Sequence, residues 1–189
     1  MQLDTQRLIL RPWRLRHPGD IEDLSALNSE PEVNQWLGGP SSPVRSAEAL
    51  RLMQERFGAS GWGVLRIEDK TGNFLGLAGL QPVRASVPFA PATEAVWRLR
   101  RAAWGHGYVV EAMTAIMASA LEAGAPTDIV AIVAAANLRS RKTAERLGFK
   151  YNPARDFLHP DLEDDHLLQP HRVFEGALSA LERSQTRGV

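Results

Sequence analysis

Hydrophobic positions along the chain recur with two different periods, and each period predicts one kind of element. Stretches in which apolar and polar residues alternate, or in which a short apolar run is unbroken, are typical of strands. They fall at residues 7–13, 63–68, 74–80, 94–100, 129–135 and 172–177. Apolar residues that recur every three or four positions predict helices at 20–27, 46–57, 108–123 and 140–147. Ser46 is the expected N-cap of the second helix.

The order of these elements, β, α, α, β, β, β, α, β, α, β, predicts an α/β or α+β fold with one mixed sheet. Residues 69–73 are typical of a hairpin turn, and the stretch 82–91, rich in proline and small residues, predicts a loop. The sequence has no internal repeat and no clear linker. We therefore expect a single domain spanning residues 1–189, in which residues 183–189 form a frayed tail.

Two glycines stand directly before the helix expected at 108–123, in the stretch WGHGY at 104–108. Glycine costs backbone entropy and adds no side chain to the core, so the pair indicates a need for bare backbone. An ordinary tight turn is one interpretation. The other is a loop whose N–H groups, together with the N-terminal end of the helix, approach an anion such as a pyrophosphate.

Composition narrows the kinds of ligand and chemistry. Lysine plus arginine and aspartate plus glutamate each number 22, so the net charge is zero and nothing favours nucleic acid or an anionic membrane as partner. The absence of cysteine excludes disulfides, thiolate metal sites and a cysteine nucleophile. The N-terminal residues lack the apolar segment of a signal peptide, and no apolar run is long enough to span a bilayer. We expect a cytoplasmic protein.

Two common phosphate-binding loops do not match the stretch at 104–108. A Walker loop requires Gly-Lys-Ser/Thr, which the sequence does not contain. A dinucleotide-binding loop requires a third glycine where Val110 stands, and an acidic residue about 20 positions further on. Asp128 lies near that distance, but it precedes the next expected strand instead of ending it.

The sequence resembles the GCN5-related N-acetyltransferase (GNAT) superfamily, and within it the branch of ribosomal-protein-alanine N-acetyltransferases (RimJ/RimL-like). The resemblance covers nearly the whole chain. It begins with TQRLILRPW at 5–13 and ALNSEPEVNQWL at 26–37, and it is strongest in PFAPATEAVWRLRRAAWGHGYVVEA at 88–112 and IVAIVAAANLRSRKTAERLGF at 129–149. It implies a single GNAT-type domain whose mixed, mostly antiparallel central sheet is splayed at the cofactor cleft and flanked by helices.

By this resemblance the protein binds acetyl-CoA as co-substrate. Backbone N–H groups at 104–108 would hold the pyrophosphate, and Leu99 would hydrogen-bond the pantetheine across a cleft from Ile132. Ala102 replaces a common Gln or Arg and Val110 a common Thr, which a loop acting through its main chain tolerates. The residues assigned to the cofactor are Leu99, Arg100, Arg101, Trp104, Gly105, His106, Gly107, Tyr108, Asn137, Arg139, Ser140 and Arg141. For the arginines, solvated helix charges are the alternative.

The resemblance also implies direct attack by the amine, without a covalent intermediate. Glu94 would take the amine proton, usually through water, and a backbone N–H near Leu99 would stabilise the oxyanion. Ala144 stands where many members carry a general-acid Tyr, so Ser140 or water would protonate the leaving thiolate. Asn137 and Ser140 match the N-x-x-S pattern of the branch. The alternatives are a surface carboxylate for Glu94, a helix N-cap for Asn137 and a surface hydroxyl for Ser140.

Three residues are expected on the acceptor side of the site, namely Trp36, His159 and His166. The histidines belong to a segment that resembles one closing the acceptor side in part of the branch, and histidine can take a proton near neutral pH. The spacing of these histidines and the nearby acids matches no helical pair of metal ligands, so we expect no metal.

These expectations combine into an acetyl-CoA-dependent N-acetyltransferase that acts on a primary amine, either a protein N-terminus or a small amine. We expect a monomer or homodimer without nucleic-acid or membrane partners. The alternative is a non-catalytic acyl-CoA-binding or scaffolding module with the same fold. A thioesterase is disfavoured because the sequence contains nothing like a nucleophile elbow.

Overall fold

A single mixed sheet forms the centre of the fold in this computed structural model, which describes residues 2–37 and 42–179. Its strand order is β1-β2-β3-β4-β5-β6-β9-β7, and β8 also pairs with β9. Among these strands only β5 and β6 run parallel. The strands are β1 Leu3–Asp4, β2 Leu8–Arg11, β3 Val64–Asp69, β4 Phe74–Pro82, β5 Thr93–Leu99, β6 Asp128–Ala134, β7 Lys150–Tyr151, β8 Phe157–Leu158 and β9 Pro170–Ala177.

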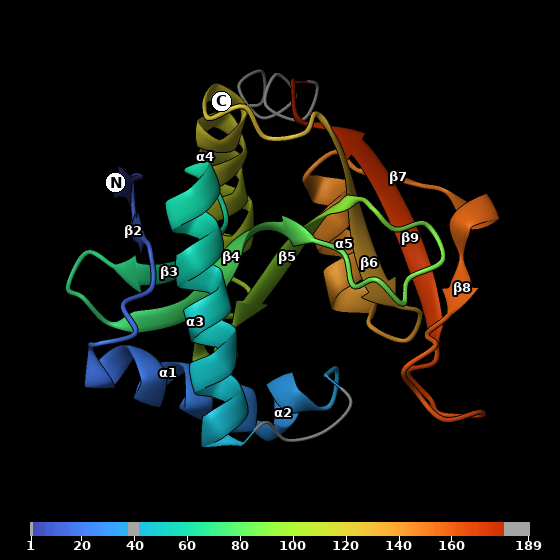
Figure 1. The fold of residues 1–189 in the computed structure, drawn as a ribbon, viewed down its shortest axis with the longest axis horizontal. Coiled ribbons are helices and arrows are strands. Elements are labelled where there is room, and N and C mark those ends of the chain that lie inside the picture. The colour runs from blue at the N-terminus through green and yellow to red at the C-terminus, as the bar shows by residue number, and fades with distance from the viewer. Residues whose placement is uncertain (1, 38–41, 180–189) are drawn as a thin grey trace.

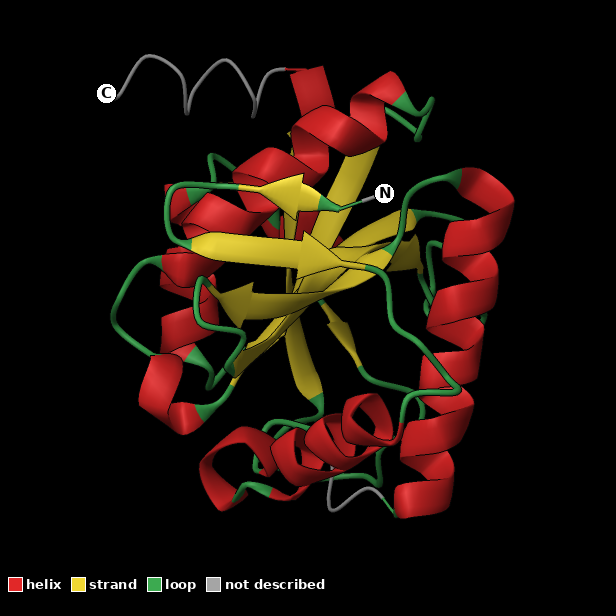
Figure 2. Ribbon diagram, turned by 90° about the vertical axis from the view of Figure 1, so that its left-hand side faces the viewer, coloured by secondary structure: helices red, strands yellow, loops and turns green. Residues whose placement is uncertain are grey.

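Helices cover both faces of the sheet (Figures 1 and 2). They are α1 Pro18–Ser29, α2 Pro31–Asn34, α3 Pro43–Ser60, α4 Tyr108–Glu122 and α5 Leu138–Arg146, with short 3-10 turns at Arg101–Ala103 and Pro153–Arg155. Helices α4 and α5 pack on one face, called here the α4 face, while α1 and α3 pack on the other, called the α3 face. Each helix buries its apolar stripe against the strands that it covers.

The apolar residues of β5 divide between the two faces. Ala95 and Leu99 belong to the main core on the α4 face, which includes Met113 and Met117 of α4. Val96 instead packs against the core on the α3 face, whose buried residues are Trp13, Leu24, Leu27, Val33, Leu50, Val64, Phe74 and Leu77. Because side chains alternate along a strand, this division fixes the face to which every residue of β5 points.

Strands β5 and β6 pair only at their N-terminal ends and then separate (Figure 1). Thr93 pairs with Ile129 and Glu94 with Val130, and the pairing stops there. Just after β5, the Arg100 N–H donates to the carbonyl of Leu75 in β4, the neighbouring strand on the side away from β6. Antiparallel hydrogen bonds alternate along a strand, so Leu99 directs its own N–H and carbonyl away from β4, toward the split.

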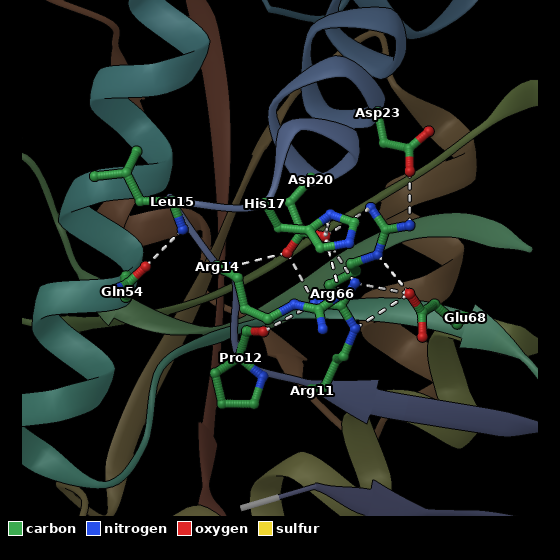
Figure 3. Close-up of polar contacts among 10 residues, drawn as sticks. All are labelled: Arg11, Pro12, Arg14, Leu15, His17, Asp20, Asp23, Gln54, Arg66 and Glu68. Atoms are coloured by element: carbon green, nitrogen blue, oxygen red, sulfur yellow. Dashed lines mark hydrogen bonds and ion pairs between the residues drawn. The ribbon is translucent and has the colours of Figure 1, made fainter. Parts of the chain in front are cut away.

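A network of charged side chains ties α1 to strands β2 and β3 (Figure 3). Arg11 donates from both Nη atoms to the carboxylate of Asp20, at 2.8 and 2.7 Å, and also contacts Glu68. Arg66 contacts Glu68 and donates to Asp23 at 2.6 Å. Asp20 is 0% exposed and Arg66 5% exposed, so the cations and anions compensate each other where water is excluded.

The fold confirms the class and every long element that the hydrophobic pattern predicts. One local prediction is wrong, because Ser46 is not the N-cap of α3. Ser42 is the cap: its side chain accepts a hydrogen bond from the N–H of Arg45, and Pro43 begins the helix. Ser46 lies inside the first turns, fully buried, where its Oγ accepts from Asn28 Nδ2 at 3.2 Å.

The pattern did not predict the shortest elements, β1, α2, β7 and β8, each of two to four residues. The tail expected to fray, residues 183–189, lies outside the described residues. Of the helices in the described part of the chain, none is long and apolar enough to cross a membrane.

Candidate active site

The loop between β5 and α4 presents a row of backbone N–H groups. Gly105 and Gly107 adopt φ values of 86° and 77°, in the left-handed region that glycine enters without strain. Within the part of the chain that the structure describes, none of the N–H groups from Gly105 to Val110 donates a hydrogen bond. The glycines are exposed, and a Cβ at Gly105 would meet nothing within 4 Å. Unpaired donors at a helix N-terminus suit a bound anion.

The N-terminal segment holds this loop from behind. Arg7 Nη1 donates to the carbonyl of His106 at 2.9 Å, and Arg7 Nε donates to Glu111 at 2.6 Å. The guanidinium of Arg7 also lies 4.8 Å from the ring centroid of Tyr108, on which the His106 ring stacks. The carbonyl of His106 is thereby engaged while the loop N–H groups stay free, and these contacts hold the loop before any ligand binds.

Trp104 connects the two segments assigned to the cofactor. Its Nε1 donates to the carbonyl of Leu99 at 2.8 Å. The guanidinium of Arg139, from the first turn of α5, lies 4.0 Å from a ring centroid of Trp104, and that of Arg101 lies at 5.0 Å. Two cations therefore gather beside the loop, although the protein as a whole carries no net charge.

The two other arginines of the predicted set, Arg100 and Arg141, have partners within the chain. Glu30 accepts from Arg100 Nε at 2.8 Å and from the backbone N–H of Arg101 at 2.7 Å. Arg141 Nη1 contacts the carbonyl of Ala135 at 3.3 Å, and its buried Nε has no partner among the described residues. Arg100 is thus neutralised within the chain, whereas Arg141 keeps an unused donor.

The N-terminus of α5 gives Asn137 and Ser140 different roles. Asn137 is the N-cap, and its Oδ1 accepts from the Ser140 N–H at 3.1 Å, which is the alternative considered from the sequence. The Ser140 hydroxyl makes no hydrogen bond to any described residue and is partly exposed. It remains a candidate proton donor.

Glu94 is a carboxylate in an apolar setting at the start of β5. Gln81 Nε2 donates to it at 3.3 Å, and among the described residues no cation forms an ion pair with it. Burial raises the pKa of Glu94 to about 7, while the hydrogen bond from Gln81 and the charge of the nearby Arg84 act in the opposite direction. A carboxylate with a pKa near 7 suits a general base at neutral pH.

An apolar cavity of about 220 Å³ lies between α3 and the strands β3 and β4. Met53 from α3 and Trp62 contribute to its wall, and Gln81, the partner of Glu94, closes one side. Glu94 itself does not line the cavity, and Gln81 is the residue that connects the two. The cavity can accommodate an apolar group of a ligand.

The residues expected on the acceptor side are only partly brought together. The ring centroids of His159 and His171 are 5.0 Å apart, and burial lowers the pKa of both, so both are neutral at neutral pH. His166 is exposed and its Nδ1 accepts from the Leu168 N–H. Trp36 follows α2 and is partly buried. His171, not predicted as a site residue, is thus the partner of His159.

No group of acids and histidines that could hold a metal occurs in residues 2–37 and 42–179.

Sequence reasoning missed three side chains of this region: Gln81, Arg84 and Arg98. Arg98 was detectable, because period-two alternation along 94–98 places it on the same strand face as Glu94. No local signal pointed to Gln81, which donates to Glu94 from β4, or to Arg84 in the following loop, whose charge acts on Glu94 without contact.

Comparison with known proteins gives this geometry a family. The model of the acetyltransferase (GNAT) domain matches residues 7–150, and the chain belongs to that family, which uses acetyl-CoA. The solved structure of a protein from Bordetella pertussis, described as a GnaT-family acetyltransferase, is similar to this chain. The two sequences are 27% identical, and the structures match with a TM-score of 0.74 over 94% of this chain and 99% of that chain.

Two more distant solved structures share the fold. The acetyltransferase from Salmonella typhimurium that modifies the N-terminal serine of ribosomal protein L7/L12 is 15% identical, with a TM-score of 0.72 over 92% of this chain and 96% of that one. The microcin C7 self-immunity acetyltransferase MccE, solved with acetyl-CoA and AMP, is also 15% identical, with a TM-score of 0.71 over 92% and 93%. At such identities the likeness shows the fold, and membership of the ribosomal-protein branch stays a prediction.

Proposed function

We propose that this protein transfers the acetyl group of acetyl-CoA to a primary amine. The observation that carries the proposal is the row of unpaired N–H groups from Gly105 to Val110, at the end of the strand that separates from β6. A pyrophosphate needs such donors together with local positive charge. Arg101 and Arg139, whose guanidinium groups both lie close to the Trp104 ring, supply that charge.

The split between β5 and β6 suits the extended arm of the co-substrate. Leu99 directs a backbone N–H toward it, so this N–H is the proposed hydrogen-bond donor to the oxygen that becomes negative during transfer. When bound, acetyl-CoA supplies the activated acyl group. The protein positions that group, and no side chain needs to form a covalent bond with it.

Glu94 is the proposed general base. Its pKa of about 7 allows it to take a proton from an ammonium group, through water, and to release that proton again at neutral pH. Ser140, whose hydroxyl has no described partner, or water then returns a proton to the leaving thiolate. Asn137 acts here by capping α5 and so fixing the position of Ser140.

Calorimetric titration with acetyl-CoA and with CoA tests the proposal, followed by amine-dependent thiol release. We expect binding in the micromolar range and acetylation of a subset of primary amines. Binding without turnover of any amine would indicate the non-catalytic acyl-CoA module. Folded protein that binds neither compound would contradict the assignment of the loop.

A further inference from the structure

Arg98 points to the same side of β5 as Glu94. Ala95 and Leu99 are buried in the core on the α4 face, whereas Val96 packs on the α3 face. By alternation, Arg98 joins Glu94 and Val96 on the α3 face. It therefore lies opposite α4 and its anion-binding loop, next to the residue whose N–H points into the split.

The guanidinium of Arg98 has a single partner in the described chain. Its Nη1 donates to Oδ1 of Asn28, a buried residue of α1 whose Nδ2 in turn donates to the Ser46 hydroxyl. No carboxylate among the described residues forms an ion pair with it. Guanidinium carries five N–H donors, so most of its hydrogen-bonding capacity is unused.

The unused donors form one edge of the group and are accessible. The fully buried side-chain nitrogens without a partner include Arg66 Nη1 and Arg141 Nε, but no atom of Arg98. Nε and Nη2 of Arg98 have no hydrogen-bond partner among the described residues, and Arg98 as a whole is partly exposed. Together these two atoms make up the edge through which arginine binds a carboxylate with two parallel hydrogen bonds.

Holding this cation without an anion is costly for the fold. Burial lowers the pKa of Arg98 to about 10, which leaves it protonated at neutral pH. The neighbouring Arg100, by contrast, has Glu30 at 2.8 Å. A neutral donor could make the same hydrogen bond to Asn28 at a lower desolvation cost. The hydrogen bond to Asn28 therefore does not explain why this position carries a positive charge.

We propose that Arg98 binds the carboxylate of the acceptor through Nε and Nη2, and that the acceptor is a small, amino-acid-like primary amine. This inference rests on the proposed function, because it names the acceptor class of the same site. Four residues of strand separate Glu94 from Arg98 by about 13 Å, which leaves room for the amino group between the base and the guanidinium. Among residues 2–37 and 42–179, no other charged group is a cause of the pKa shift at Arg98, so a phosphate dianion would meet one cation there.

Matched acceptors test the inference directly. L-Methionine, L-phenylalanine and L-glutamate are each compared as free acid, primary carboxamide and decarboxylated amine, together with tripeptides that begin with the same residues. Methionine and phenylalanine are included because of the apolar cavity that Gln81, the partner of Glu94, helps to line. We expect kcat/KM for at least one free acid to exceed that of its carboxamide by about 10- to 100-fold, the range of one charge-assisted contact.

Three variants assign that preference to Arg98. Arg98→Gln should reduce the ratio of acid to carboxamide to about 1, and Arg98→Lys should keep part of it. Asn28→Asp should also abolish the preference, because the new carboxylate would pair with the guanidinium that is left in place. Arg51→Gln, which removes an exposed arginine of α3, is the matched control and should keep the wild-type ratio.

Acetyl-CoA titration of each variant separates this inference from the proposed function. Wild-type protein that binds acetyl-CoA but acetylates carboxamides or tripeptides as well as free acids would overturn the inference and leave the function intact. If no amine is acetylated, the same acids and carboxamides are titrated into CoA-saturated protein. Equal binding of the two, or a preference that survives Arg98→Gln, would also overturn it.

Discussion

Two regions of this molecule hold buried or partly buried charged side chains, and they do so in opposite ways. In the network beneath α1, Arg11 and Arg66 face Asp20, Asp23 and Glu68 at hydrogen-bonding distances. On the α3 face of β5, Glu94 and Arg98 have neutral partners, the amides of Gln81 and Asn28. The first region contains its own counter-charges, whereas the second does not.

The pKa values express the same contrast. Burial would raise the pKa of Asp20, but hydrogen bonds from Arg11 and the Arg14 N–H, with the charges of Arg11 and Arg66, lower it to about 2. Glu94 is raised to about 7 because burial prevails there. Compensated charges hold elements together, and uncompensated charges and donors are available to a ligand. Substitutions in the first region should therefore affect stability, and those in the second activity.

The largest expected effect is that of Asp20→Asn on stability. Removing one anion leaves Arg11 and Arg66 buried without full compensation, which typically costs about 3–5 kcal/mol. Denaturant unfolding at pH 7 measures this loss. Glu48→Gln, which breaks an exposed ion pair with Arg51, should cost less than about 1 kcal/mol. A cost for Asp20→Asn no larger than the control would contradict a structural role for the network.

The same variant has a predicted pH dependence. The folded-state pKa of Asp20, about 2, lies below its ordinary value of 3.8, so the wild-type contribution is fully present above about pH 4. It is lost as the pH falls toward 2. The difference in unfolding free energy between wild type and Asp20→Asn should therefore shrink over this interval and stay constant between pH 5 and about 8.

Glu94→Gln should change the rate and the stability in opposite directions. Loss of the base should lower turnover by about 100-fold at neutral pH and remove a rise in rate centred near pH 7. Since the folded-state pKa exceeds the ordinary value of 4.5, the wild-type protein loses stability as pH rises from about 4.5 to 7. At pH 8 the variant should therefore unfold at a higher denaturant concentration than the wild type. An unchanged rate would transfer the role of base to His159 or His171.

Gly107→Val should weaken acetyl-CoA binding by roughly 100-fold, because a branched side chain would strain a residue at φ 77° and would extend toward the guanidinium of Arg7, which holds the loop. Gly124→Val is the matched control. Gly124 has a φ of 78° at the other end of α4, so it imposes similar strain far from the loop. Calorimetry should show a loss for the first variant and wild-type affinity for the second. Equal losses would indicate a general effect on α4.

Ser140→Ala should have the smallest effect, about tenfold on turnover, because water can replace a hydroxyl as proton donor. The affinity for acetyl-CoA should change less than the rate, since Asn137 continues to cap α5 without the Ser140 hydroxyl. Single-turnover measurements separate the two quantities. A full wild-type rate would assign protonation of the thiolate to water.

The shape of the loop assigned to the cofactor was predictable from the sequence because it depends on local residues. Gly105 and Gly107 adopt left-handed φ values directly before the N-terminus of α4. The glycines and the start of the helical pattern are neighbours in the sequence, so both features could be recognised there. The long elements were predictable for the same reason, since their periods repeat over several residues. Strands of two residues such as β7 and β8 have no period, and Pro43 was a start signal for α3 that the choice of Ser46 overlooked.

The acceptor side was less accessible to sequence reasoning. His166 and His171 are both histidines in one polar segment, and only the pairing of β8 with β9 brings His171 beside His159. Likewise, the sequence allows Glu94 to be either a base or a surface carboxylate. Only the tertiary structure buries its carboxylate and places Gln81 beside it.

By itself the sequence determined the order of the long elements and the glycine turn before α4, because each depends on steric and hydrogen-bonding preferences within a few residues. Only the tertiary structure decided which charges are compensated. Arg11 and Arg98 look alike in the sequence, yet Asp20 reaches one, and only the amide of Asn28 reaches the other. That difference depends on desolvation and on the packing of α1 against the sheet, which bring together residues distant along the chain.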